Sequence, residues 1–289
     1  MTSRGRVGMR FRAAFVACAA LACAACALLR SPMPESGEIR LEGEYRLHLQ
    51  DVWREGNFLY WAHTSQLLKT DLSGRILAKA DVERHHAGIE VRDGKVYVAV
   101  CDYQAKTGWK TLPESRVTVN VYDAGTLKLL EEHVTDVNDR SGSLAILDDG
   151  TFLVGCLRPQ DISKTQVRFH HLDRDFKLIK SYVMDDVPVK LGIETIKVHG
   201  GFCYLTMYLD GGLCLKLDRN FKEVARYQLN GTYGLVFDGD DVWAGYSRQD
   251  PETKKWTSGL KRVASPFAEK ASPPKPSQER ADAGKQSAG

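Results

Sequence analysis

The sequence lacks the short motifs that mark several common kinds of active site. Beyond residue 29 it contains no Cys-x-x-Cys pair and no cysteine–histidine spacing of the kind that holds zinc. It also contains no Gly-x-Ser-x-Gly elbow, and residues 140–143 (RSGS) read as a loop, which argues against a serine hydrolase. Zinc-finger and serine-hydrolase functions are therefore not predicted.

A strong charge of one sign is missing as well. The formal net charge is +3 at pH 7, but Arg4, Arg6, Arg10 and Arg12 lie together at the start of the chain without an acidic residue among them. The rest of the chain therefore carries about −1, which is not the basic surface that nucleic-acid binding requires. No nucleic-acid partner is predicted.

The N-terminal segment carries a targeting pattern. The apolar run at residues 13–29 (AAFVACAALACAACALL) follows those arginines, as in a secretory signal, and is shorter than the roughly 20 residues of a membrane-spanning helix. We therefore expect residues 1–29 to direct export, to the periplasm or cell envelope or out of the cell. The letters ALAC ending at Cys23 resemble a bacterial lipobox, which makes Cys23 a candidate lipidation site. Membrane contact is expected only through this segment or its lipid. The alternative is that its cysteines are small apolar residues of a signal.

Four cysteines follow that segment, all within apolar, strand-like runs. They are Cys101, Cys156, Cys203 and Cys214. In an exported chain they could form two disulfides, with three possible pairings. We favour buried thiols, because free cysteine commonly behaves as a small hydrophobic residue.

A repeated pattern organises residues 45–263. Five segments share a strand, a tight turn with glycine and a more apolar strand, and glycine suits the turn because it adopts positive φ. The turn glycines are Gly56, Gly94, Gly150, Gly200 and Gly239. A second hairpin follows each of the first four, with an aspartate that we interpret as a turn cap rather than a calcium ligand. These aspartates are Asp71, Asp123, Asp173 and Asp218.

This pattern predicts an all-β protein, most simply a β-propeller of five four-stranded blades. The turn glycines are separated by 38, 56, 50 and 39 residues, close to the roughly 40–45 of a propeller blade with loop insertions. The fifth unit lacks a clear fourth strand, while residues 39–49 offer a spare one. We therefore expect the N-terminal strand to close the last blade, in a monomer with a linker at 30–38, the propeller at 39–264 and a disordered Pro-rich tail at 265–289.

The strand–Asp-Gly–strand pattern over residues 45–263 resembles the broad class of bacterial secreted β-propeller repeat proteins, NHL-like or quinoprotein-like. The resemblance implies the fold and no particular activity, because a fold by itself does not fix function. The GHxxWD signature and the complete catalytic set of a named family are absent.

We expect function on the face that carries the longer loops, at 102–116, 157–166 and 246–259, because binding residues concentrate on variable loops held by a rigid frame. A protein, peptide or glycan would bind there as partner, and no cofactor is predicted. His85 and His86 interrupt the repeat on this face, and we expect His86 to point toward the centre. The candidate ligand-binding residues are His85, His86, Asp102, Tyr103, Trp109, Arg140, Arg158, Tyr233, Arg248 and Trp256.

A propeller hydrolase or lyase of the glycoside or ester type is the alternative. Such chemistry needs two or three carboxylates around one mouth, and the candidates are His86, Glu90, Asp139 and Glu194. Glu90 and Glu194 each follow Gly-Ile at the start of an inner strand. His63, His85, His86 and Asp102 could converge on a metal, but nothing in their spacing requires it, so no metal is predicted.

Overall fold

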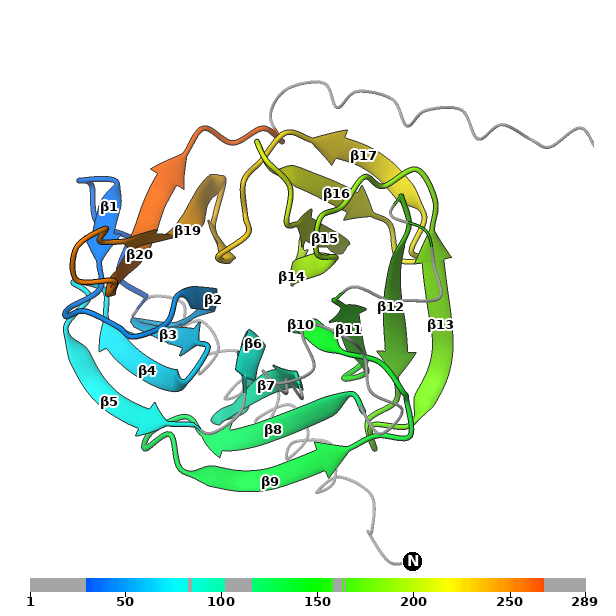
Figure 1. The fold of residues 1–289 in the computed structure, drawn as a ribbon, viewed down its shortest axis with the longest axis horizontal. Coiled ribbons are helices and arrows are strands. Elements are labelled where there is room, and N and C mark those ends of the chain that lie inside the picture. Colours follow the sequence, from blue (N-terminus) through cyan, green and yellow to red (C-terminus); the bar gives the residue numbers. More distant parts are fainter. Residues whose placement is uncertain (1–29, 83–84, 102–115, 158–162, 164, 268–289) are drawn as a thin grey trace, which may run out of the picture.

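A computed structural model describes residues 30–82, 85–101, 116–157, 163 and 165–267, and its strands form five antiparallel sheets arranged in a ring (Figure 1). Each sheet has four strands and forms one blade. The predicted five-bladed propeller is therefore confirmed. Within the described ranges, no helix is long and apolar enough to cross a membrane.

Each blade runs from an inner strand near the centre of the ring to an outer strand at its rim (Figure 1). The strands of blades 1 and 2 are β2 (Leu49–Glu55), β3 (Phe58–His63), β4 (Gln66–Asp71), β5 (Ile76–Asp81), β6 (His85–Arg92), β7 (Lys95–Cys101), β8 (Thr118–Asp123) and β9 (Leu129–Val134). Those of blades 3 and 4 are β10 (Ser141–Ile146), β11 (Phe152–Cys156), β12 (Val167–Leu172), β13 (Leu178–Met184), β14 (Ile193–His199), β15 (Phe202–Met207), β16 (Leu213–Leu217) and β17 (Glu223–Tyr227).

Blade 5 is closed by the N-terminal strand, as predicted. Its strands are β18 (Leu235–Asp238), β19 (Asp241–Gln249), β20 (Trp256–Val263) and β1 (Glu38–Arg40). β1 pairs antiparallel with β20, with Ile39 opposite Leu260, and the two lie side by side in Figure 1. The residues before β1 also pack on the ring, since Met33 is buried in the core between blades 5 and 1. This closure pairs the outer edge of β20 within the molecule.

The turns confirm the roles assigned to glycine and aspartate. Gly56 and Gly94 have φ values of 57° and 73°, and the other three turn glycines are also positive. The Asp71 carboxylate accepts hydrogen bonds from the backbone N–H groups of Ser73 and Arg75. Asp123, Asp173 and Asp218 cap their turns in the same way. These aspartates hold turns through their side chains.

The hydrophobic core lies between neighbouring blades. Trp61 and Trp243 are fully buried in the cluster that joins blades 1 and 5, and similar clusters fill the other junctions. The cysteines after the N-terminal segment are buried thiols rather than disulfides, as their strands predict. Side chains from opposite blade faces fill each junction, so the ring positions its inner strands rigidly.

One extra residue interrupts strand pairing at the start of four inner strands. Gln50 in β2, Gly142 in β10 and Glu194 in β14 each stand between two paired residues, and β6 has the same shift after His86. A Cβ on Gly142 would lie 2.6 Å from the carbonyl oxygen of Ile193, so blade 3 has no room for a side chain there. Bulges redirect side chains and often occur beside binding sites. Gln50 and Glu194 are the two bulge residues with polar side chains, so they are candidates for such a role.

Candidate functional site

We call the end of the ring where the inner strands begin the upper end, and the end with the turn glycines the lower end. At the upper end, Gln50 joins blades 1 and 2. Its side-chain amide lies 2.9 Å from the Thr64 hydroxyl, 3.3 Å from both ring nitrogens of His48 and 3.3 Å from Nε2 of His85. Gln50 is buried, so its position is determined by these neighbours.

Glu194 and Tyr233 extend this group across blades 4 and 5. Glu194 is only 7% exposed, and none of the described residues donates a hydrogen bond to its carboxyl group. It lies close enough to Tyr233 for its charge to raise the pKa of that phenol, to which burial contributes most. The Tyr233 ring in turn contacts His48, with ring centroids 5.9 Å apart. We call His48, Gln50, His85, Glu194 and Tyr233 the upper cluster.

The upper cluster is uncharged at neutral pH. Burial lowers the pKa of His48 and lowers that of His85 to about 4, so both imidazoles are neutral at pH 7. Burial raises the pKa of Glu194 to about 8, so its carboxyl group is mostly protonated at pH 7. A protonated carboxyl group donates one hydrogen bond and accepts others. The cluster therefore presents neutral donors and acceptors.

Aromatic surface borders the upper cluster. The half-buried ring of Trp256 lies 5.3 Å from His48, centroid to centroid. Arg248, which is exposed, lies over the Tyr246 ring at 5.5 Å from its centroid. Aromatic rings beside hydrogen-bonding groups suit ligands with both apolar and polar faces.

The lower end contains hollows around the ring's centre. A cavity of about 320 Å³ is lined by Trp53, Glu90, Arg92, Ile146 and Val198, among others, so four inner strands contribute to it. A second cavity, of about 250 Å³, shares Trp53 and Val198 with the first.

The buried charged groups at the lower end are paired. The Nζ atom of Lys197 in β14 lies 2.8 Å from the Asp51 carboxylate in β2. This ion pair therefore connects blade 4 with blade 1 across the centre of the ring. A second ion pair joins the neighbouring blades 1 and 5, with Arg54 lying 2.7 Å from Asp238. These pairs hold blades together at the centre.

Glu90 also belongs to the lower end. Its carboxylate accepts a hydrogen bond from the backbone N–H of Ile146 in the next blade, at 2.7 Å, and lies 3.4 Å from Arg92. Burial raises its pKa to about 7, against the opposing effect of these two partners. The contacts give Glu90 a structural task, fastening blade 2 to blade 3.

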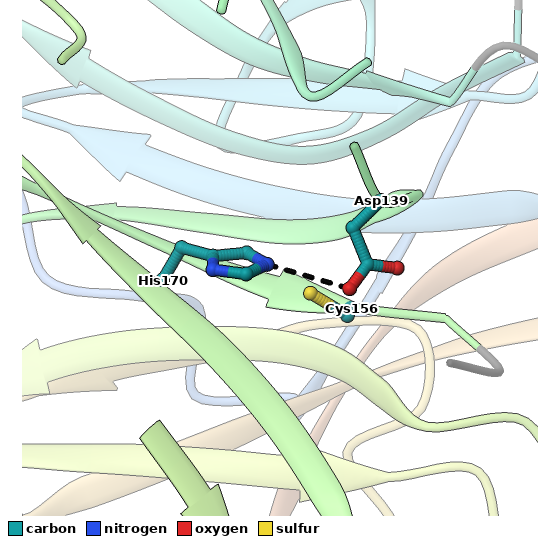
Figure 2. Close-up of side chains that lie close together, drawn as sticks. All are labelled: Asp139, Cys156 and His170. Atoms are coloured by element: carbon teal, nitrogen blue, oxygen red, sulfur yellow. Dashed lines mark hydrogen bonds and ion pairs between the residues drawn. The ribbon is translucent and has the colours of Figure 1, made fainter. Parts of the chain in front are cut away.

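A third polar group lies inside blade 3. Figure 2 shows the imidazole of His170 directed at the Asp139 carboxylate, with the Cys156 sulfur beside both. The Nε2 atom of His170 lies 3.4 Å from Oδ2 of Asp139, and Arg168 lies 3.2 Å from the same oxygen. Burial acts to raise the pKa of Asp139, but hydrogen bonds from His170, the Arg140 N–H and the Cys156 thiol outweigh it, so the pKa is lowered.

The structure distributes the predicted residues over different surroundings. Tyr233 and His85 belong to the upper cluster, whereas His86 is buried and hydrogen-bonded to the Tyr122 hydroxyl, so His85 takes the place we expected for His86. Arg140 is buried at the start of blade 3. The predicted residues Cys23, Asp102, Tyr103, Trp109 and Arg158 lie outside the described residues.

The three candidate catalytic carboxylates make separate contacts. Asp139 is bound inside blade 3, Glu90 contacts Ile146, and Glu194 belongs to the upper cluster. Glu90 lies two residues before the last paired residue of its strand, and Glu194 lies five residues before that of β14. At about 3.3 Å per residue, this offset is roughly 10 Å along the strand direction.

Sequence reasoning missed His48 and Gln50. His48 directly precedes the inner strand of blade 1 and, counted from the turn, matches His85 of blade 2, while Gln50 is the bulge residue within β2. The stretch was assigned to the spare N-terminal strand, which ends earlier, at Arg40. The letters HLQD before the first repeat were the available signal, because they align with the residues that begin the other inner strands.

Comparisons with known proteins agree on the fold alone. No family model matches the chain, and no curated protein matches it. Similar solved structures include a GH43 enzyme from Xanthomonas citri complexed with xylose (12% identity, TM-score 0.53, 86% of this chain and 98% of that one) and the GH43 BlXynB protein from Bacillus licheniformis (11%, 0.55, 77% and 55%). Another is xylan beta-1,4-xylosidase from Bacillus halodurans (12%, 0.52, 78% and 54%). The chain thus matches little more than half the length of the two Bacillus structures.

Proposed function

We propose that this protein is a carbohydrate-binding propeller that holds a neutral glycan at the upper cluster. The observation that carries the proposal is Glu194, a buried carboxyl group at the mouth of the ring to which no described residue donates a hydrogen bond. A ligand hydroxyl could replace water as the hydrogen-bond partner of this carboxyl group. Glu194 is the extra residue of a bulge at the start of β14, and bulges redirect side chains out of the regular strand pattern.

The chemistry of the site favours a glycan over a peptide or protein. His48, His85 and Glu194 are neutral at pH 7, so the upper cluster offers no fixed charge to a charged ligand. Sugars present hydroxyl groups around a ring with an apolar face, and Tyr233 and Trp256 supply aromatic surface. Neutral hydrogen-bonding groups beside aromatic rings match both features.

The first test is calorimetric titration with neutral oligosaccharides, including the xylose series because a solved structure of similar fold is described with xylose. We expect one site per chain. Glu194→Ala should weaken binding about fivefold, since one lost hydrogen bond is worth about 1 kcal/mol. Glu90→Gln, a matched change at the lower end, should leave the affinity unchanged.

The pH dependence of glycan affinity tests whether the glycan binds at the upper cluster or elsewhere. Wild-type affinity should fall as the pH rises through about 8, because Glu194 then loses the proton that it donates. Glu194→Gln keeps a neutral donor and acceptor, so its affinity should stay constant over that range. Equal loss of affinity in both proteins, or binding that Glu90→Gln weakens instead, would refute the site.

A glycoside hydrolase is the second candidate, and one observation favours it. A buried carboxyl group that is still protonated at pH 7 is what a general acid requires. Hydrolysis also needs a second carboxylate, whereas Asp51, Glu90 and Asp139 are bound to other groups. We expect no release of reducing sugar from glycans that bind. Hydrolysis that Glu194→Gln abolishes while binding remains would favour the hydrolase.

The N-terminal pattern supports export, and we propose that the propeller acts in the periplasm or at the cell envelope as a monomer. Cys23 would carry a lipid if the segment is a lipoprotein signal. Metabolic labelling with a palmitate analogue tests this, with Cys23→Ser as the control that should remove the label. A label retained in Cys23→Ser would exclude lipidation at that residue.

A further inference from the structure

We propose that Asp139, Cys156 and His170 form a binding site for one zinc ion inside blade 3. Their ligand atoms, a carboxylate oxygen, a thiol sulfur and an imidazole nitrogen, all lie within 4.8 Å of one another. Tetrahedral zinc holds such atoms at about 2.0–2.3 Å from the metal, which places neighbouring ligands about 3.3–3.7 Å apart. The 3.4 Å between His170 Nε2 and Asp139 Oδ2 already falls in that range.

The three residues converge from different parts of the blade. Asp139 precedes the inner strand β10, Cys156 ends β11, and His170 lies in the middle of β12. All three are buried, at 3% exposure or less. Strand pairing fixes the backbones of Cys156 and His170, and the contacts of its carboxylate with Arg168 and His170 hold Asp139, so the ligand set is in place before any metal arrives.

Neighbouring groups orient the ligands. The Nδ1 atom of His170 lies 2.8 Å from the Ser181 hydroxyl, so the Nδ1 proton can be donated there while Nε2 keeps its lone pair for the metal. Arg168, 3.2 Å from Oδ2 of Asp139, can occupy one lone pair of that oxygen and leave the other for zinc. Hydrogen bonds to metal-bound histidine and carboxylate are usual around protein zinc sites.

The charge and proton balance is simple. The Cys156 thiol, which donates to Asp139 in the metal-free arrangement, gives up one proton to the solvent and binds as thiolate. Together with the Asp139 carboxylate it provides two negative charges against the two positive charges of zinc, and the Arg168 guanidinium beside Asp139 leaves the site with a net charge of about +1. Mixed sulfur, nitrogen and oxygen ligands favour zinc over magnesium or calcium. Three protein ligands leave the fourth position for water.

The test uses the full chain with Cys18, Cys23 and Cys26 replaced by serine, because thiols of the N-terminal segment would bind zinc themselves. After dialysis against zinc chloride and then buffer, elemental analysis should find one zinc per chain. Cobalt(II) should produce a sulfur-to-metal charge-transfer band, and zinc should raise the Tm of the stripped protein. Cys156→Ala should lose the metal and the band, while Cys203→Ala, a buried thiol elsewhere, should keep both.

A second variant keeps the proposal falsifiable if Cys156→Ala fails to fold. Ser181→Ala retains all three ligands and removes only the partner of His170, so zinc affinity should fall by about 10–100-fold. Substoichiometric zinc in the parent protein, or one zinc per chain that both Cys156→Ala and Ser181→Ala retain at unchanged affinity, would overturn the site.

Discussion

Both ends of the ring's centre contain buried polar side chains, but the two ends differ in whether those side chains have partners within the protein. At the lower end the buried charged side chains have partners of their own: Lys197 binds Asp51, and Glu90 binds the Ile146 N–H. In the upper cluster His48, His85 and Glu194 are neutral at pH 7, and no described residue donates a hydrogen bond to Glu194. Groups paired within the protein stabilise the fold, whereas a carboxyl group without a partner among the described residues can hydrogen-bond a ligand.

The comparison is sharpest for Glu90 and Glu194, because each follows Gly-Ile in the sequence. The bulge in β14 makes Glu194 an extra residue between paired neighbours, while Glu90 is paired with Tyr97. The residue of β14 that matches Glu90, counted from the turn, is Lys197. The two Gly-Ile-Glu tripeptides therefore lie at different heights along the ring axis. Glu90 holds blades 2 and 3 together, whereas Glu194 has no partner among the described residues and can bind a ligand.

The largest expected effect comes from breaking the pair at the lower end. Lys197→Met leaves the Asp51 carboxylate fully buried without its countercharge, which should lower the free energy of unfolding by about 3–5 kcal/mol. Urea denaturation measures the loss. The double variant with Asp51→Asn removes the stranded charge and should recover part of the stability. A single variant as stable as the wild type would show that the lower end does not depend on this pair.

A smaller effect is expected on the pH dependence of the free energy of unfolding, to which Glu194 and Glu90 should contribute differently. Their raised folded-state pKa values, about 8 for Glu194 and about 7 for Glu90, mean that the folded protein keeps protons that the unfolded chain has lost, so stability falls as pH rises. The buried histidines oppose this trend, because the unfolded chain loses its remaining histidine protons between about pH 6.5 and 7.5, which adds about 0.4 kcal/mol of stability for each. The glutamate contributions are therefore read as differences between the wild type and each glutamate variant, in which the histidines are unchanged.

Between pH 6.5 and 8, therefore, Glu194 should cost about 2 kcal/mol of stability and Glu90 less, at about 1.4 kcal/mol per pKa unit. Denaturation at both pH values measures the slope. Glu194→Gln should remove most of it and Glu90→Gln the smaller remainder. A slope unchanged in Glu194→Gln would mean that its carboxyl group is ionised in the folded protein at pH 7.

The fold could be predicted because its turns depend on local residues. The candidate site could be predicted only in part, because it depends on strand register. The turn glycines and the spare strand before the first unit predicted five blades and their closure, because each turn depends on its own residues. His85 was identified because it interrupts the repeat. The bulge that displaces Glu194, and the pairing of Lys197 with Asp51 from the opposite side of the ring, depend on strand register and ring closure, which no local pattern encodes.

The smallest expected effect compares two bulge residues within the upper cluster. Gln50→Ala removes an amide that lies within hydrogen-bonding distance of Thr64, His48 and His85, and should lower the free energy of unfolding by about 1 kcal/mol. Glu194→Gln at pH 6.5 should change it by less than about 0.5 kcal/mol, since it breaks no hydrogen bond between described residues. Glycan affinity should respond to both positions. If Glu194→Gln were the more destabilising change, Glu194 would be a structural residue like Glu90, and the contrast between the two ends would fail.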